Sequence, residues 1–311
     1  MVGVPLLLTD ADVAARLDAS TAVTAMRDAL LAAHEGRLIA PPRASAVLEG
    51  GRLVMTAGHL ADEWYGFRSY DTFGHADGEQ LVVLHDARDG RIRAIAVGEE
   101  IGSRRTGALG GAAVDLLAAR DAGTVAVIGS GRQAWTQVWA AAAVRPLRSV
   151  TVFSRSAARR AAFATRVRAE LGVPAWPAGT AEEAVRGREI VIVATTSTRP
   201  VLSAADLAPG AHVNVVGFKQ RGRSEFGLDL PARAGVIATD SVAQARSYDP
   251  PLVLSGTAYE AAVRDLGAIA AGAAPGRTKP DEVTMFLSVG LAGTEVFLLD
   301  RVAALLTSAS S

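Results

Sequence analysis

The 311-residue sequence contains no cysteine, few aromatic residues and no excess of either charge. The lack of cysteine excludes disulfides, thiolate metal ligands and a thiol nucleophile. Lys+Arg and Asp+Glu both number 32, so the net charge of zero gives no sign of a nucleic-acid or anionic-membrane partner. No apolar run approaches the roughly 18 residues that a membrane-spanning helix needs, and the start, MVGVPLLLTDADV, lacks the basic region of a signal peptide. We therefore expect a soluble, cytoplasmic protein that binds neither nucleic acid nor membrane.

Length and local patterns divide the chain into stretches of different character. At 311 residues it suits two modest domains. The first hundred residues predict a helix over 20–36, capped by Ser20 and stopped by Gly36, and then strands without helices between them. The expected strands are 43–48, 52–58, 66–70, 81–86 and 92–97. Consecutive strands of this kind predict an antiparallel or mixed sheet.

Beyond residue 100, apolar strands alternate with helices. The expected strands are 124–129, 149–153, 189–196, 211–217 and 234–240. Strands that are apolar throughout and separated by helices are typical of a parallel sheet covered on both faces. This part of the chain therefore predicts the α/β class, with a Rossmann-type doubly wound parallel sheet. The later segment 282–306 is predicted to be helical.

A glycine motif stands between the first of these strands and the following helix. It reads Gly129-Ser130-Gly131-Arg132-Gln133-Ala134, or GxGxxA. Gly129 would permit the tight turn, Gly131 would let the backbone approach a pyrophosphate, and Ala134 would let the helix pack close to the strand. The alternative is an ordinary glycine turn without a ligand. The run of βα units around the motif favours dinucleotide binding.

The end of the next strand indicates which dinucleotide is bound. A carboxylate there would bond the ribose 2′-OH of NAD, but the sequence VTVFSRSAARR has no acid. Ser154, Arg155 and Ser156 offer hydroxyls and a guanidinium, and Arg159 and Arg160 follow a turn later. Such donors match a 2′-phosphate, so we expect NADPH/NADP, with NAD less favoured. The alternative is that these arginines form a solvated helix face.

Arginines near element ends are the other candidate binding groups. Arg43, Arg68 and the Arg104-Arg105-Thr106 run lie beside predicted strands or a helix. A guanidinium binds a carboxylate in two parallel hydrogen bonds. For any one arginine taken alone, simple placement on the surface is the more common alternative. Five histidines are scattered without ligand spacing, so we expect no metal.

Six segments together resemble the ornithine cyclodeaminase/mu-crystallin family over nearly the whole chain. They are GRLIAPPRASAV, IGSRRTGALGGAAVDLLA, VAVIGSGRQA, VNVVGFKQRGRSEF, ATDSVAQA and MFLSVGLAGTEV. The resemblance implies a Rossmann domain, placed at 113–281, inserted into a second α+β domain made from 1–112 and 282–311. It also implies that the second domain binds the substrate and pairs with its copy in a homodimer.

The resemblance carries over site residues motif by motif. Arg43 and Arg105 match the arginines that hold a substrate α-carboxylate, and Thr106 matches the threonine near the cofactor phosphates. The segments expected near the nicotinamide and its ribose are Thr195-Thr196-Ser197, Val216-Gly217 and Ser288-Val289-Gly290.

Two positions depart from the family pattern. Arg68 stands where the family usually has lysine, and arginine binds a carboxylate but is a poor proton donor. Lys219 stands after Phe218, where cyclodeaminases carry the aspartate that handles the distal amine of ornithine. A cation there would repel an ammonium group. Lys219 is then a proton donor, a ligand of a second anion, or an exposed loop lysine.

These features predict an NAD(P)H-dependent oxidoreductase acting on the C=N or C–N bond of a small α-imino or α-amino acid. Arg43, Arg105 and Arg68 would hold the carboxylate, and positioning would supply much of the rate. Tyr70, Asp71 and Lys219 are candidates for handling the proton. Two alternatives stay open: a cyclodeaminase-type lyase converting ornithine to proline and ammonia, and a non-catalytic NADPH-dependent binder. The substrate side chain and the physiological direction are left undetermined.

Overall fold

The computed structural model describes residues 4–74 and 79–308. The chain forms two compact units, one made of Met1–Arg105 with Gly290–Ser311 and the other of Thr106–Val289. The divisions fall at 105/106 and 289/290, rather than at the expected 112/113 and 281/282. The first division lies within helix α3 (Glu100–Leu117). Among the described residues, no helix combines the length and the apolar character needed to cross a bilayer.

The first unit is built on a mixed sheet in the order β1-β7-β6-β5-β4-β2, with β3 paired to β4. Its strands are β1 (Leu6–Leu8), β2 (Leu38–Ile39), β3 (Ala44–Leu48), β4 (Gly51–Leu60), β5 (Trp64–Asp71), β6 (Leu81–Asp86) and β7 (Ile92–Val97). All pairs are antiparallel except β1 with β7, which confirms the predicted mixed sheet. The unit's other helices are α1 (Asp10–Arg16), α2 (Ala19–His34) and α10 (Thr294–Ser308).

Helix α2 begins earlier than predicted. Its N-cap is Asp18, whose side chain accepts a hydrogen bond from Thr21 N at 2.7 Å, so the cap predicted at Ser20 was wrong. Aspartate and serine cap helices about equally well, and the sequence offers both at this point. The helix ends at His34, followed by Gly36 with φ of 74°, as the stop signal predicted.

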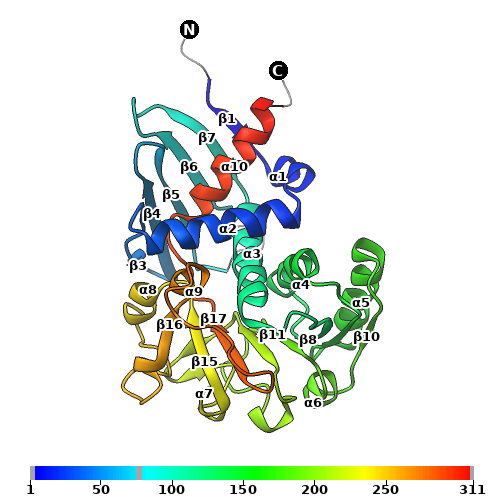
Figure 1. Ribbon diagram of the computed structural model, residues 1–311. Coiled ribbons are helices and arrows are strands. Elements are labelled where there is room, and N and C mark those ends of the chain that lie inside the picture. The colour runs from blue at the N-terminus through cyan, green and yellow to red at the C-terminus, as the bar shows by residue number, and fades with distance from the viewer. Residues whose placement is uncertain (1–3, 75–78, 309–311) are drawn as a thin grey trace. The chain divides into compact units, whose positions relative to one another are not determined.

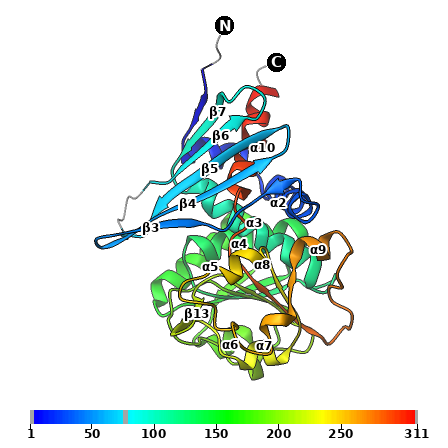
Figure 2. The ribbon, with the colours of Figure 1, turned by 90° about the vertical axis from the view of Figure 1, so that its left-hand side faces the viewer.

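Helix α10 packs on one face of this sheet, and the opposite face is open (Figure 2). Trp64 meets Phe297 of α10 edge to face at 5.9 Å between ring centroids. On the open face, several large apolar side chains are exposed. They are Leu7, Leu53, Met55, Tyr65 and Leu81. These side chains make the open face more apolar than an ordinary solvated sheet face.

The second unit contains eight parallel strands in the order β10-β9-β8-β11-β12-β17-β15-β16. Figure 1 labels several of them, among them β8, β11, β15 and β17. Its strands are β8 (Thr124–Ile128), β9 (Ser149–Phe153), β10 (Ala175–Pro177), β11 (Ile190–Val193), β12 (His212–Val215), β15 (Ala234–Thr239), β16 (Val263–Asp265) and β17 (Val283–Leu287). A small hairpin, β13 (Lys219–Gln220) with β14 (Arg223–Ser224), follows β12. Its helices besides α3 are α4 (Arg132–Val144), α5 (Ala157–Leu171), α6 (Ala181–Val185), α7 (Asp229–Arg233), α8 (Val242–Arg246) and α9 (Leu266–Ala270).

Alternate residues of each strand enter separate cores on the two faces of this sheet. In β11, Ile190 and Ile192 pack with α4 and α5, whereas Val191 and Val193 pack with α6, α7 and α8. All four are fully buried, which explains the continuous apolar run in the sequence. The predicted doubly covered parallel sheet is confirmed.

The helix predicted over 282–306 was wrong in its first part. Residues Val283–Leu287 form β17, which lies between β12 and β15 in the parallel sheet. All five are buried, and a short apolar run of this kind cannot be assigned to helix or strand by periodicity alone. The helix begins only at Thr294.

Candidate functional site

The glycine turn after β8 has the geometry that an anion-binding site requires. Gly129 has φ of 117°, and a Cβ there would lie 2.1 Å from Ala194 O, so only glycine fits. Gly131 is the N-cap of α4 and makes no side-chain cap hydrogen bond. A Cβ at Gly131 would meet no atom within 4 Å, so there is space beside the N-terminus of α4, where helix amides bind anions. Ala134 is fully buried in the core between α4 and the sheet.

The other residues of the motif border this turn. Ser130 Oγ donates to Ser154 Oγ at 3.0 Å, which ties the turn to the end of β9. Gln133 Oε1 is buried and has no hydrogen-bond partner in the described parts of the chain. Arg132 is exposed. The turn therefore fits the diphosphate of a dinucleotide, because backbone amides can donate hydrogen bonds to its oxygens. Gln133 Oε1 is itself an acceptor and donates no hydrogen bond to an anion.

The segment after β9 combines structural and exposed groups. Ser156 caps α5 by accepting from Arg159 N at 3.3 Å, and Ser154 Oγ donates to Ser156 O at 3.2 Å. Arg155 and Arg159 are exposed, whereas Arg160 donates to Ser154 O at 2.9 Å. No acid follows β9 before α5 begins at Ala157. The serines therefore hold the loop, and the exposed guanidiniums are the groups placed to meet a ligand charge.

The loops after β11 and β12 are joined by a glutamate that the sequence reasoning missed. Glu225 is fully buried and accepts from Thr195 N and Thr195 Oγ1 at 2.9 and 2.8 Å, and from Gly217 N at 2.5 Å. Ser197 donates its hydroxyl to Arg199 O at 2.7 Å. The signal in the sequence is weak, because segment 218–233 between two predicted strands carries two acids, Glu225 and Asp229, and no local pattern distinguishes them. Of the other predicted residues in these loops, Thr196 is exposed, and the backbone carbonyl of Val216 accepts a hydrogen bond from Lys219.

Lys219 is buried rather than exposed. Its side chain is 4% accessible, and Nζ donates to Val216 O at 3.1 Å and to Gly217 O at 2.6 Å. The alternative of an exposed loop lysine is therefore wrong. Ser288 follows β17 and is buried, and its backbone N donates to Val215 O at 3.0 Å.

Thr106 begins the part of α3 that belongs to the second unit. Its carbonyl accepts from Gln137 Nε2 at 2.9 Å, and Gln137 Oε1 accepts from Asn214 Nδ2 at 3.0 Å. Asn214 in turn bonds His212, which is fully buried, and burial lowers the pKa of His212 to about 3. This chain of neutral polar groups anchors the helix carrying Thr106 to the parallel sheet.

In the first unit, Arg68 and Arg105 share one carboxylate oxygen. Glu295 Oε1 lies 2.6 Å from Arg68 Nη1 and 2.7 Å from Arg105 Nη2, and its side chain is 1% exposed. Burial alone would raise the pKa of Glu295, but Arg105 and Arg68 more than offset it, and the pKa falls to about 2. Arg68 also donates to Gln80 Oε1. Sequence reasoning missed Glu295, whose charge holds two of the three predicted arginines in place.

Arg43 and Arg105 converge at Gly290. This glycine has φ of 90°, and a Cβ there would lie 3.2 Å from Arg43 Nη2 and 3.3 Å from Arg105 Nη1. Arg43 Nη1 bonds Tyr70 OH at 3.4 Å, and the Arg68 guanidinium lies 4.1 Å from the Tyr70 ring centroid. Among the residues that the structure describes here, three guanidiniums meet the single carboxylate of Glu295, and guanidiniums suit the binding of a small carboxylate.

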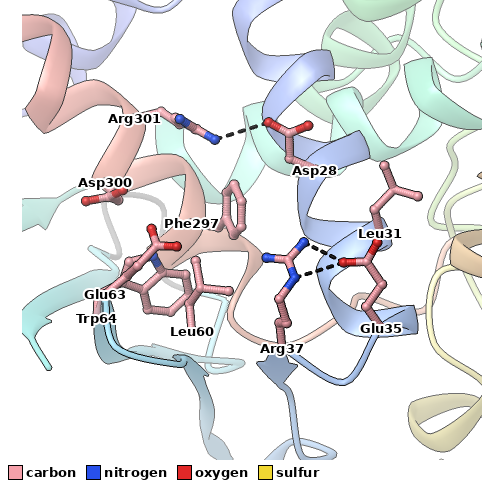
Figure 3. Close-up of a pocket in the computed structure, with 10 residues that line it drawn as sticks. All are labelled: Asp28, Leu31, Glu35, Arg37, Leu60, Glu63, Trp64, Phe297, Asp300 and Arg301. Carbon is pink, nitrogen blue, oxygen red and sulfur yellow. Dashed lines mark hydrogen bonds and ion pairs between the residues drawn. The ribbon is translucent and has the colours of Figure 1, made fainter. Parts of the chain in front are cut away.

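The first unit also has a pocket of about 210 Å³ (Figure 3), and none of the predicted site residues lines it. Leu31, Leu60 and Trp64 contribute apolar walls. The ion pairs Arg37–Glu35 and Arg301–Asp28 also line the pocket. The described residues include no group of three or more histidine or acidic side chains that could hold a metal ion.

The parallel sheet, its glycine turn and the attached mixed-sheet unit define the class, a Rossmann-type α/β protein. The chain belongs to the ornithine cyclodeaminase/mu-crystallin family, whose sequence model matches residues 4–307, and this confirms the resemblance seen in the sequence.

Named relatives agree with this membership. The chain is 33% identical over 222 residues to a Delta(1)-pyrroline-2-carboxylate reductase of Bacillus cereus, covering 70% of this chain and 68% of the relative. It is 28% identical over 211 residues to the ketimine reductase mu-crystallin of Mus musculus, covering 68% and 64%. The solved structure of Thermococcus litoralis Delta(1)-pyrroline-2-carboxylate reductase, in complex with NADH and L-proline, matches with a TM-score of 0.90 at 26% identity over 98% of both chains.

Proposed function

We propose that this protein is an NAD(P)H-dependent oxidoreductase that reduces the C=N bond of a small α-imino acid, or oxidises the C–N bond of the matching amino acid. The observation that carries the proposal is the pair of guanidiniums, Arg43 and Arg105, aimed at the space beside Gly290. A carboxylate there would accept from both, as the family resemblance implies. The likeness to a reductase whose structure holds NADH and L-proline supports the same substrate class.

The bound nicotinamide would supply a hydride to the substrate carbon. The chain's own residues then bind and orient the acid, because Arg43 and Arg105 fix its carboxylate and hence the carbon beside it. A protonated iminium brings its own proton, so reduction needs no strong acid in the site. This suits the residues present, because Asp71 accepts from Phe73 N at 2.9 Å and Lys219 donates to two backbone carbonyls.

We propose NADPH as the preferred cofactor. Arg155 is exposed at the end of β9 beside Ser154 and Ser156, and this segment carries no carboxylate for a ribose 2′-OH. A guanidinium at that position favours a 2′-phosphate.

We also propose a homodimer formed through the open face of the mixed sheet. Alternate residues of β4, including Leu53 and Met55, and Tyr65 of β5 expose apolar side chains there. Covering such a face stabilises a protein by about 25 cal/mol for each Å² of apolar surface removed from water. A cytoplasmic location stays a prediction.

The proposal is tested by following NADPH absorbance with cyclic imino acids and with α-keto acids plus amines. We expect oxidation of NADPH with at least one cyclic imino acid, and Arg43→Ala to lower kcat/KM by about 30-fold or more while NADPH affinity is retained. Arg16→Ala, at an exposed helix position, is the control. Binding of NADPH without turnover of any substrate would instead support the non-catalytic binder. Conversion of ornithine to proline without net NADPH change would support the lyase, against which the buried cation of Lys219 argues.

A further inference from the structure

Glu225 bridges the loops that follow two neighbouring strands. Thr195 comes two residues after β11 and Gly217 two residues after β12, and these strands are paired in parallel register. Glu225 Oε2 accepts both Thr195 donors, and Oε1 accepts Gly217 N. One fully buried carboxylate therefore fixes the spacing of the two loops at the carboxyl edge of the sheet.

The bridge requires a carboxylate and a glycine. All three partners of Glu225 donate, so both of its oxygens must accept, which an amide side chain cannot do. A Cβ at Gly217 would lie 2.4 Å from Glu225 Oε2 and 2.3 Å from Thr195 O. Burial raises the pKa of Glu225, while the hydrogen bonds from Thr195 and the charge of Lys219 oppose the rise.

The bridge engages three of the donors that the two loops would otherwise present to a ligand. Thr195 N and Oγ1 and Gly217 N all point to Glu225. Lys219 Nζ occupies the carbonyls of Val216 and Gly217. The loops therefore offer a pre-formed wall rather than flexible donors, and a wall of fixed shape binds a flat ring with little loss of entropy.

We propose that Glu225 is a positioning residue for the nicotinamide half of the dinucleotide, acting through the Thr195 and Gly217 loops. The inference rests on the proposed function, because dinucleotides lie at the carboxyl ends of strands in such sheets. Glu225 makes no contact with the reacting atoms in this role. It sets the shape of the surface on which the ring rests.

Glu189 supplies a matched control at the opposite edge of the same sheet. Its Oε2 accepts from Gly123 N, Thr124 N and Thr124 Oγ1 at 2.8, 2.8 and 2.9 Å. Thr124 begins β8, and Glu189 directly precedes β11, so this bridge joins strand amino ends. The same kind of carboxylate bridge therefore exists where no dinucleotide is expected.

The experiment compares the wild type with Glu225→Gln and Glu189→Gln in binding NADPH and 2′-phospho-ADP-ribose, which lacks the nicotinamide. Calorimetric titration gives both dissociation constants, and thermal unfolding gives Tm. In Glu225→Gln the side-chain NH2 group would face a loop N–H donor and could not accept its hydrogen bond, so the loops should shift. We therefore expect the Kd of NADPH to rise about tenfold or more and the Kd of 2′-phospho-ADP-ribose to stay within about twofold of the wild-type value. Glu189→Gln should lower Tm and leave the ratio of the two constants unchanged.

An unchanged ratio of the two dissociation constants in Glu225→Gln, whether both ligands bind as in the wild type or both bind equally more weakly, would overturn the inference. If that variant does not fold, Thr195→Val removes one of the three donors at nearly constant volume, and the same ratio must shift in the same direction. A wild type that binds neither ligand would refute the proposed cofactor itself. Binding of both ligands with no turnover would refute only the proposed reaction, and the ratio would still decide the role of Glu225.

Discussion

Replacing Gly131 by alanine should separate cofactor binding from stability. Gly131 has φ of −91° and ψ of −175°, an extended conformation that any residue adopts. The added Cβ would meet no atom within 4 Å. The free protein should therefore tolerate the change, and the reduced freedom of the unfolded chain should stabilise it by about 0.4–1 kcal/mol.

The same methyl group should interfere with NADPH. Gly131, the N-cap of α4, supplies no side-chain cap, and a diphosphate must approach the Cα of Gly131 to accept hydrogen bonds from the N-terminus of the helix. A hydrogen bond to a charged group contributes about 1.5–3 kcal/mol. Since about 1.4 kcal/mol corresponds to a tenfold change, losing one such bond should raise the Kd of NADPH roughly 10- to 100-fold.

Titration calorimetry and thermal unfolding measure the two effects on the same samples. Gly187→Ala is the control, because Gly187 has φ of 72° with open space around it, in the segment between α6 and β11. That variant should lose about 1 kcal/mol of stability through the strained φ and keep its NADPH affinity. An NADPH Kd within twofold of wild type in Gly131→Ala would refute the assignment of the turn to the diphosphate.

Three further predictions concern other parts of the molecule. The pKa of Glu295 is lowered to about 2, so its ion pairs stabilise the fold fully above its ordinary pKa of 4.5, and this stabilisation is lost as pH falls from 4.5 to about 2. In the wild type we therefore expect the free energy of unfolding to fall by on the order of 3 kcal/mol over this range through Glu295, and Glu295→Gln should abolish that part of the fall, as measured by urea unfolding at each pH. Arg155→Ala should raise the Kd of NADPH about tenfold and leave that of NADH unchanged. Met55→Glu, at a side chain 46% exposed on the open sheet face, should give monomers by light scattering, whereas Trp176→Glu, at 54% exposure in the other unit, should keep the dimer.

The sequence predicted the parts of the fold that local pattern determines. The strands from 124 to 240 are apolar on both faces, and this property alone distinguishes a doubly covered parallel sheet from a half-exposed one. It did not predict β17, because Val283–Leu287 is equally apolar and is followed by a true helix. The assignment of β17 depends on its pairing with β12 and β15, which no local pattern contains.

In the candidate site, too, local sequence determines some features and contacts between distant residues determine others. The glycine turn is local, and its residues have the geometry that the motif requires. Glu295 is 227 positions from Arg68, so their ion pair could not be read from spacing. The sequence around Lys219 is typical of a loop. Its burial goes with the hydrogen bonds that Nζ donates to the carbonyls of Val216 and Gly217, which the sequence does not reveal. Pairings that arise only in the folded chain were the ones missed.

The ion pair between Arg68 and Glu295 changes the role expected for Arg68. The family resemblance suggested a third carboxylate ligand at this position, but the structure commits its guanidinium to Glu295 and Gln80. Glu295 Oε1 also holds Nη2 of Arg105, while Nη1 of Arg105 lies toward Gly290. A free arginine would lose side-chain entropy on binding an acid, whereas Arg105 is already fixed by the buried carboxylate. If Arg105 binds the substrate carboxylate as proposed, Arg68 and Glu295 would act on the substrate through Arg105. Arg68→Lys should then weaken substrate binding, measured as a raised KM, by loosening Arg105 rather than by removing a ligand.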